Sequence, residues 1–155
     1  MEVNPRELPI HKKAVEIQKL VDHILDAAPE GNEMLKHQIE FMHANALMIT
    51  AKIAGAEGGD LYDLRMENAA IIRKCARELL VGLRGLEMFG YDEQRYFNLL
   101  RAELEEFRLL FVDRVAAFDK ENYIIDRWGL FNPPGVGPHD KDPDDEVPFD
   151  PKDHL

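Results

Sequence analysis

The feature that most constrains the fold is a hydrophobic repeat of helical period, which recurs in four long segments of the chain. In the first two segments, the apolar residues fall within about 40° of one line on a helical wheel, and each of the four segments has an apolar face. Glycine or proline interrupts the pattern between segments, at Pro29, Gly55 and Gly90. Because the linkers are short, successive helices must run antiparallel. The sequence therefore predicts an all-α fold, an up-down-up-down four-helix bundle.

Capping residues predict where these helices begin and end. Asn32 is the expected N-cap of the second helix, and Asp60 followed by Asp63 is a variant capping box for the third. Gly90 is expected to close the third helix, because glycine readily adopts the left-handed conformation found after a helix end. A weak continuation of the fourth pattern reaches Trp128. With their caps, the helices are predicted at 9–28, 32–54, 60–89 and 93–118.

The predicted core is the set of residues on these four apolar faces. Its members are Ile10, Ala14, Ile17, Val21, Ile24 and Ala28; Leu35, Ile39, Met42, Ala46, Ile49 and Ile53; Leu61, Leu64, Asn68, Ile72, Cys75, Leu79, Leu83 and Leu86; and Tyr96, Leu100, Leu104, Phe107, Phe111, Val115 and Phe118. Asn68 stands out because it is polar. It either fixes the register by bonding a neighbouring helix, with Glu103, Arg114 or His43 as partner, or orients a small ligand in a polar pocket.

Composition and charge narrow the classes of function. A chain of 155 residues with 45% hydrophobic and 32% charged residues is typical of a globular protein. The formal net charge of −11 produces a field that repels nucleic acid and anionic membranes. No segment approaches the roughly 18 to 20 apolar residues of a membrane span, and the N-terminal residues lack the pattern of a signal peptide. We therefore expect a cytoplasmic protein with no nucleic-acid or membrane partner.

The chain changes character after Trp128. Prolines recur at 133, 134, 138, 143, 148 and 151 among aspartates and glycines, and the residues from Pro133 onward carry −5 of the net charge of −11. Such a segment has too little apolar surface to offset the entropy lost on ordering. We predict a four-helix bundle domain at 1–128 and an extended or disordered acidic tail at 129–155.

No catalytic or cofactor-binding residue is predicted. Cys75, the single cysteine, lies on the core face of its helix, where a thiol behaves as a small hydrophobe. The sequence contains no nucleophile elbow, no P-loop, no dinucleotide-binding glycine pattern and no zinc-type cysteine cluster. The absence of these motifs favours a protein that is not an enzyme, and no cofactor is expected.

A metal-binding alternative depends on Glu40 and His43. Their E-x-x-H spacing is the one used by carboxylate-bridged metal sites in ferritin-like bundles, where residues i and i+3 share a helix face. Such sites need a second copy of the motif, and the fourth helix contains no histidine. Glu40 also points about 140° away from the apolar face of its helix. We therefore predict no metal ligands, and interpret both residues as surface or interface side chains.

An arginine strip lies on the third helix, opposite the predicted core. It consists of Arg73, Arg77 and Arg84. The strip has two interpretations, an anion-binding surface or a face that is paired with acids on the fourth helix, on the tail or on another subunit. The net charge of −11 favours pairing with acids.

The second helix carries another apolar face, roughly opposite the core. It consists of Phe41, Ala44, Leu47, Met48 and Ala51. No helix of a four-helix bundle is central, so a helix that is apolar on two faces implies a partner. We predict a non-catalytic structural or interaction module that forms a homodimer through Phe41, Leu47 and Met48. Alternatively the tail covers this face through Trp128 and Phe131.

Overall fold

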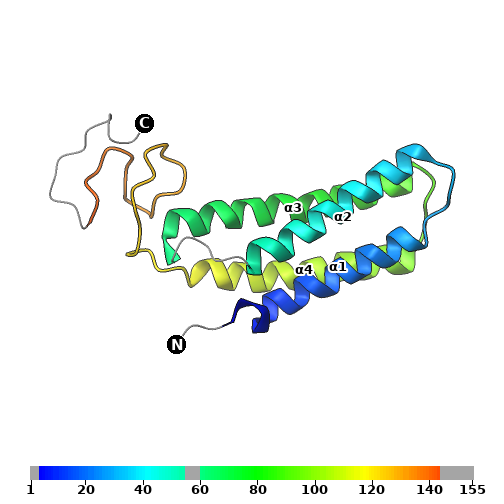
Figure 1. Cartoon of the computed structure of the whole chain (residues 1–155), viewed down its shortest axis with the longest axis horizontal. Coiled ribbons are helices and arrows are strands. Elements are labelled where there is room, and N and C mark those ends of the chain that lie inside the picture. The colour runs from blue at the N-terminus through cyan, green and yellow to red at the C-terminus, as the bar shows by residue number, and fades with distance from the viewer. Residues whose placement is uncertain (1–3, 55–59, 144–155) are drawn as a thin grey trace.

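The structure is a computed structural model, and it describes residues 4–54 and 60–143. In these residues a short 3₁₀-helix, η1 (Pro5–Glu7), precedes four α-helices, α1 (Pro9–Asp26), α2 (Glu33–Ala54), α3 (Tyr62–Met88) and α4 (Gln94–Ala116). Successive helices run in opposite directions along one long axis (Figure 1). The predicted all-α four-helix bundle is confirmed.

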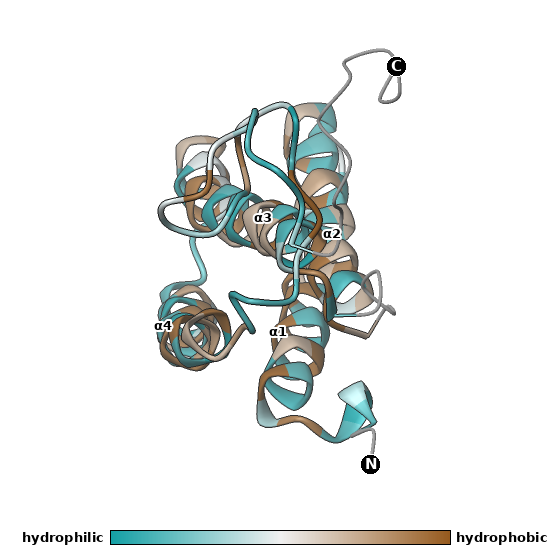
Figure 2. Ribbon diagram, turned by 90° about the vertical axis from the view of Figure 1, so that its left-hand side faces the viewer, coloured by the Kyte–Doolittle hydropathy of each residue, from teal (hydrophilic) through white to brown (hydrophobic). Residues whose placement is uncertain are grey.

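The helices pack on one another unequally. α2 packs along α1 on one side and along α3 on the other, and α1 also packs along α4. α3 and α4 follow each other directly in the chain, yet they touch far less than these pairs do. A view along the bundle places α1 and α4 below α2 and α3, with α4 set apart from α3 (Figure 2).

The core forms from the predicted faces over most of the bundle. Every predicted residue of α1 and α2 is buried, except Ala28 beyond the end of α1, which is half-buried. In α3 and α4 the buried members of the predicted set are Ile72, Cys75, Leu79, Leu83, Leu86, Leu100, Leu104 and Phe107. The apolar periodicity therefore identifies the side of each helix that faces the other three.

The first turns of α3 depart from the predicted face. Tyr62 and Ala69 are buried, whereas Leu61, Leu64 and Asn68 are only half-buried. The cause is a second small core, in which Tyr62 and Ala69 pack with Phe118, a residue that follows α4. The backbone N–H of Tyr62 also donates to the carbonyl of Asn122. At this end, residues beyond α4 thus take the place of α2 as neighbours of α3, and a different side of α3 is buried.

Two predicted helix ends are confirmed by hydrogen bonds. The Asn32 side chain accepts from the N–H of Leu35 at 3.1 Å, as an N-cap does. Gly90 adopts a φ of 87°, and the N–H of Tyr91 donates to the carbonyl of Leu86 at 2.9 Å. This bond across the left-handed residue is the Schellman arrangement, and it turns the chain sharply from α3 towards α4.

Two other predicted ends are wrong. Asp60 does not cap α3, because the cap position belongs to Leu61, which has no side-chain capping bond. Asp60 instead has a φ of 68°, and its carboxylate pairs with Arg65. α4 ends at Ala116 and does not continue to Trp128, because the chain after it enters turns, with Asp119 accepting from the N–H of Glu121.

The α2–α3 contact depends on glycine. A Cβ built on Gly82 would lie 2.7 Å from Cγ of Met42, closer than side chains can approach. At Gly85, one turn later, the nearest atom is Cδ of Gln38 at 3.3 Å. The missing side chains let the two backbones approach closely, although glycine is otherwise unfavourable inside a helix.

α4 is attached mainly to α1. The ammonium group of Lys13 donates to Glu103 at 2.8 Å and to Glu106 at 2.6 Å, and its ion pair with Glu16 is 2.9 Å long. These carboxylates raise the pKa of Lys13 above its ordinary value. At the start of α4, the buried Tyr91 hydroxyl donates to the carbonyl of Ile24 at 2.8 Å. α1 and α4 are therefore linked at two places along the bundle.

The described part of the C-terminal segment, 129–143, is irregular, as predicted, and it is held by specific hydrogen bonds. Desolvation opposes the ionisation of Asp126, but the backbone N–H groups of Phe131, Trp128 and Leu130 donate to its carboxylate and lower its pKa. Arg127 donates to the carbonyls of Pro138 and Asp140. The remaining predicted tail residues, 144–155, lie outside the described residues.

Candidate functional site

Two surfaces expose apolar side chains in a pattern, and the first is the outer face of α2. We use this name for Phe41, Ala44, Leu47, Met48 and Ala51. Phe41 is 50% exposed, Leu47 42% and Met48 43%, and both alanines are exposed. The described C-terminal segment leaves this face uncovered. Trp128 is itself 89% exposed, so Trp128 and Phe131 do not cover the outer face of α2 as the alternative predicted.

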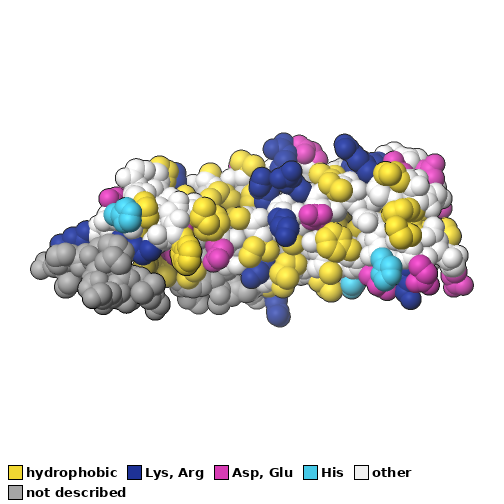
Figure 3. Space-filling model, turned by 90° about the horizontal axis from the view of Figure 1, so that it is seen from above, with side chains coloured by type: hydrophobic (Ala, Val, Ile, Leu, Met, Phe, Trp, Pro, Cys, Tyr) yellow, Lys and Arg dark blue, Asp and Glu magenta, His cyan; other side chains and the backbone are white. Residues whose placement is uncertain are grey.

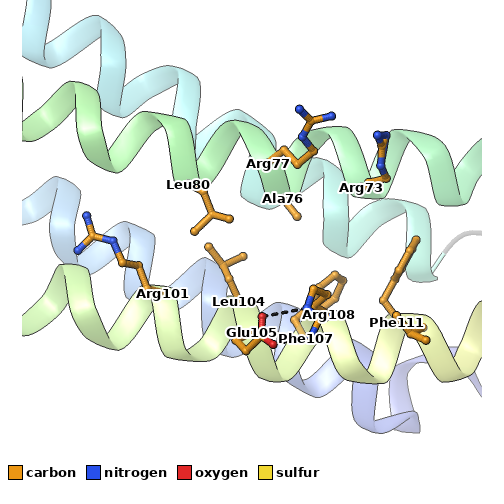
Figure 4. Close-up of a pocket in the computed structure, with 11 residues that line it drawn as sticks. Arg73, Ala76, Arg77, Leu80, Arg101, Leu104, Glu105, Phe107, Arg108 and Phe111 are labelled. Carbon is orange, nitrogen blue, oxygen red and sulfur yellow. Dashed lines mark hydrogen bonds and ion pairs between the residues drawn. The ribbon is translucent and has the colours of Figure 1, made fainter.

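The second surface is a groove between α3 and α4, which we call the α3–α4 groove. It forms where the two helices separate, and it has a volume of about 440 Å³. Its apolar side chains are Ala76 and Leu80 from α3 and Leu104, Phe107, Phe111 and Val112 from α4. Leu80 and Leu104 point towards each other across it (Figure 4). Leu104 and Phe107 are buried in its floor, whereas Leu80 and Val112 are about half exposed at its mouth.

Arginines surround this groove. Arg73 and Arg77 come from α3, and Arg101 and Arg108 come from α4. From above, Lys and Arg side chains gather midway along the molecule, with hydrophobic side chains on either side (Figure 3). The groove therefore combines an apolar floor with a cationic rim, in a chain whose net charge is −11.

The four arginines differ in whether they are paired. Arg108 binds both oxygens of Glu105, with distances of 2.9 Å from Nε and 2.6 Å from Nη2. Arg101 binds Glu87 at 2.7 Å, and this arginine lowers the pKa of the Glu87 carboxyl group. Within the described residues, Arg73 and Arg77 make no hydrogen bond or ion pair. The predicted pairing of the arginine strip with acids thus does not extend to them.

The metal-ligand alternative gains no support from the geometry. His43 turns towards α1, where its Nδ1 lies 2.7 Å from a carboxylate oxygen of Asp22. Glu40 is exposed, and one of its carboxylate oxygens lies 3.9 Å from Nδ1 of His37. Residues 4–54 and 60–143 contain no group of three or more histidine, cysteine, aspartate or glutamate side chains placed to hold an ion.

The geometry also gives little support to the alternative of a polar pocket around Asn68. Asn68 is half-buried at the rotated start of α3, and it does not line the α3–α4 groove. Two of its three predicted partners bind elsewhere, since Glu103 pairs with Lys13 and His43 lies against Asp22.

The thiol of Cys75 is buried, and desolvation raises its pKa, so the reactive thiolate is disfavoured. This cysteine packs in the core next to residues such as Leu79, as its place on the apolar face predicts. The geometry gives it the role of a small core residue.

Comparison of the chain with protein-family models, with curated proteins and with solved structures found no match. In the described residues, no helix is long and apolar enough to cross a membrane. The chain is thus an all-helical protein whose candidate surfaces must be interpreted from their own chemistry.

Sequence reasoning identified Arg73 and Arg77 but missed the groove beside them. Leu104, Phe107 and Phe111 have the periodicity of core residues, and that periodicity does not distinguish a closed core from the wall of a groove. One signal was present in the sequence, because Arg101, Glu105 and Arg108 place charges on the flank of the α4 apolar face that turns towards α3.

Proposed function

We propose that this protein is a non-catalytic interaction module that forms a homodimer through the outer face of α2. One observation carries the proposal. Residues 41–51 contain no Lys, Arg, Asp or Glu, and yet Phe41, Leu47 and Met48 are 42–50% exposed. Monomeric soluble proteins seldom expose contiguous apolar surface of this kind. In a chain with a net charge of −11, an uncharged face is also where two copies repel each other least.

The spacing of the exposed residues suits a closed two-fold dimer, the commonest oligomer. A two-fold axis that crosses α2 between Ala44 and Asn45 relates position 41 to position 48. The Phe41 ring of each copy would then lie against the Met48 thioether of the other, a favourable sulfur–aromatic contact. Ala44, at the centre, has a small side chain that permits close approach of the two helices.

Magnitudes predict a reversible dimer. Full burial of a large apolar side chain contributes roughly 1.5–3 kcal/mol, and these side chains are already about half buried. About half of this burial free energy is therefore still available for dimer formation. Summed over three residues in each copy, it is comparable to the roughly 4–15 kcal/mol that association costs. The balance favours an equilibrium between monomer and dimer that shifts with concentration.

Sedimentation velocity over two decades of concentration around the micromolar range tests the proposal. The wild type should shift from monomer towards dimer as concentration rises. Phe41→Glu/Met48→Glu should remain a helical monomer throughout, because each copy would then bring two carboxylates into an apolar contact. A matched control is Leu99→Glu/Leu109→Glu on α4, which changes two leucines of similar exposure and should dimerise like the wild type.

A wild type that stays monomeric at every concentration would contradict the proposal. So would a folded Phe41→Glu/Met48→Glu protein that still dimerises. Metal analysis of the same preparation addresses the ferritin-like alternative. A stoichiometric transition metal that is lost in Glu40→Ala would favour metal binding over a structural role.

A further inference from the structure

The α3–α4 groove has the shape of a trough that runs along the bundle. Its lining on α4 extends from Arg101 to Val112, about 16 Å along the helix axis at 1.5 Å per residue. The lining on α3, from Arg73 to Leu80, covers about 10 Å. The trough is therefore long and narrow, and it lies on helices other than α2, apart from the proposed dimer face.

Both ends of the trough are closed by contacts between the α3 and α4 sides of the bundle. At one end Glu87 of α3 binds Arg101 of α4 at 2.7 Å. At the other end Phe118, just beyond α4, packs with Tyr62 and Ala69 of α3, and the Arg65 guanidinium lies 5.4 Å from the centre of its ring. The opening between these ends is thus a bounded site and not a general separation of the helices.

The charge of the rim selects an anion. Four arginines line the groove, whereas Glu105 is the acidic residue in its lining, and Glu87 neutralises Arg101 from beside it. Arg101 and Arg108 are held by these carboxylates, which leaves Arg73 and Arg77 without an ion pair in the described part of the chain. Two positive charges one turn apart on a helix repel each other unless an anion lies between them.

Arg73 and Arg77 are placed to receive such an anion at the rim. Both are exposed, and their guanidinium groups lie over α3 above the groove, whereas Ala76 and Leu80 point down towards α4 (Figure 4). Arginine side chains are long, and an unpaired one can turn to a new partner by rotating about its side-chain bonds. The planar guanidinium group forms paired hydrogen bonds with a carboxylate or a phosphate.

The size of the groove suits a small ligand. The groove offers about 440 Å³, within the range of small-molecule pockets. A single extended hydrocarbon chain fits its narrow apolar floor, which is about as long as the 16 Å lining on α4.

We propose that the α3–α4 groove binds a single-chain amphipathic anion. The alkyl chain lies along Leu80, Leu104 and Phe107, and the carboxylate or phosphate head binds Arg73 and Arg77 at the rim. The inference adds a ligand class to a protein proposed above only as an interaction module, and it does not depend on the dimer.

Titration calorimetry with dodecyl compounds below their micelle concentrations tests the ligand class. Dodecanoate or dodecyl phosphate should bind with one site per chain, and the tighter of the two identifies the preferred head group. Dodecanol and dodecyltrimethylammonium should bind at least tenfold more weakly, and inorganic phosphate alone should not bind measurably. Equal binding of dodecanol and the anions would overturn the proposal, as would binding of none of the compounds.

Two variants locate the site. Arg73→Gln/Arg77→Gln should weaken binding of the preferred anion by about tenfold or more, since charged hydrogen bonds are lost. The matched control, Arg84→Gln/Arg95→Gln, removes the same charge outside the groove and should leave affinity within about twofold of the wild type. An equal loss in both variants would overturn the assignment, because it would show a general effect of net charge.

A third variant tests the apolar floor. Ala76→Phe should fill the trough and abolish binding of the alkyl chain, with helicity checked by circular dichroism. Phe41→Glu/Met48→Glu should bind the anion as the wild type does, so failure of the dimer proposal and failure of this one give different results. Full binding by a folded Ala76→Phe protein would overturn the proposal.

Discussion

α3 meets α2 and α4 in opposite ways. Towards α2 it presents Gly82, where even a methyl group would collide with Met42 at 2.7 Å. Towards α4 it presents Ala76 and Leu80, and the two helices separate around a groove of about 440 Å³. One helix thus has a side with close backbone approach and a side that lines an open groove.

The contrast shows that the spacing between two helices depends on the other helices that each of them packs against. On the open side, Leu80 points towards Leu104 of α4, while Arg101 and Arg108 of α4 are paired with Glu87 and Glu105. On the close side, the α2 residues that contact Gly82 and Gly85 are Met42 and Gln38, which carry no charge. Close packing on α2 therefore closes one interface, whereas α4 packs mainly on α1 and leaves the other interface open.

The largest test of this contrast compares two adjacent leucines. Leu79 is fully buried, whereas Leu80 is 42% exposed in the groove. Leu79→Ala should lower the free energy of unfolding by about 2–5 kcal/mol, because it leaves a cavity in a packed core. Leu80→Ala should cost less than about 1 kcal/mol, since the space it leaves is already open to solvent. Urea unfolding of both variants measures the difference, and equal losses would show that the groove side is closed in solution.

A smaller effect is expected from adding volume on each side of α3. Gly82→Val should destabilise the protein by about 1–3 kcal/mol, because the new methyl groups overlap the buried Met42 side chain. Ala76→Val adds its methyl groups to the groove and should cost about 0.5 kcal/mol, the loss of helix propensity alone. Thermal unfolding provides the comparison, and a neutral Gly82→Val would mean that α2 and α3 are not in close contact.

The smallest effect concerns the ion pair that closes one end of the groove. Arg101 lowers the pKa of Glu87, so this pair stabilises the fold above the ordinary carboxyl pKa and its contribution is lost as the pH falls through the lowered value. As the pH falls below the ordinary carboxyl pKa of about 4.3, the stabilities of wild type and Glu87→Gln should therefore approach each other. In an NMR titration, Arg101→Gln should raise the pKa of Glu87. An unchanged pKa would show that the pair is not formed.

The elements that sequence predicts well are those that depend on local chemistry. The apolar faces of α1 and α2 follow from spacing alone, and the Asn32 cap and the Gly90 turn follow from backbone and side-chain preferences. Each of these features involves residues within a few positions of one another. The periodicity of α4 also gave the apolar side correctly, although it assigned Tyr96 where Phe97 is the fully buried residue.

The features that sequence did not predict depend on distant neighbours. Asn68 lies outside the closed core because Phe118, far along the chain, packs against the start of α3 and changes which side is buried. The groove is similar, since Leu104 and Leu80 look like ordinary bundle residues until the spacing of α3 and α4 is known. Periodicity gives the direction of an apolar face but not its distance from the next helix.

The attachment of α4 to α1 has a kinetic consequence. The Tyr91 hydroxyl and the Lys13 ammonium group hold α4 at two places, so its distance from α3 is set through α1 and α2. A ligand that enters the groove therefore meets walls that are already in position. We therefore expect the proposed anion to be captured without a slow rearrangement of helices, so that differences in affinity between ligands lie mainly in their dissociation rates.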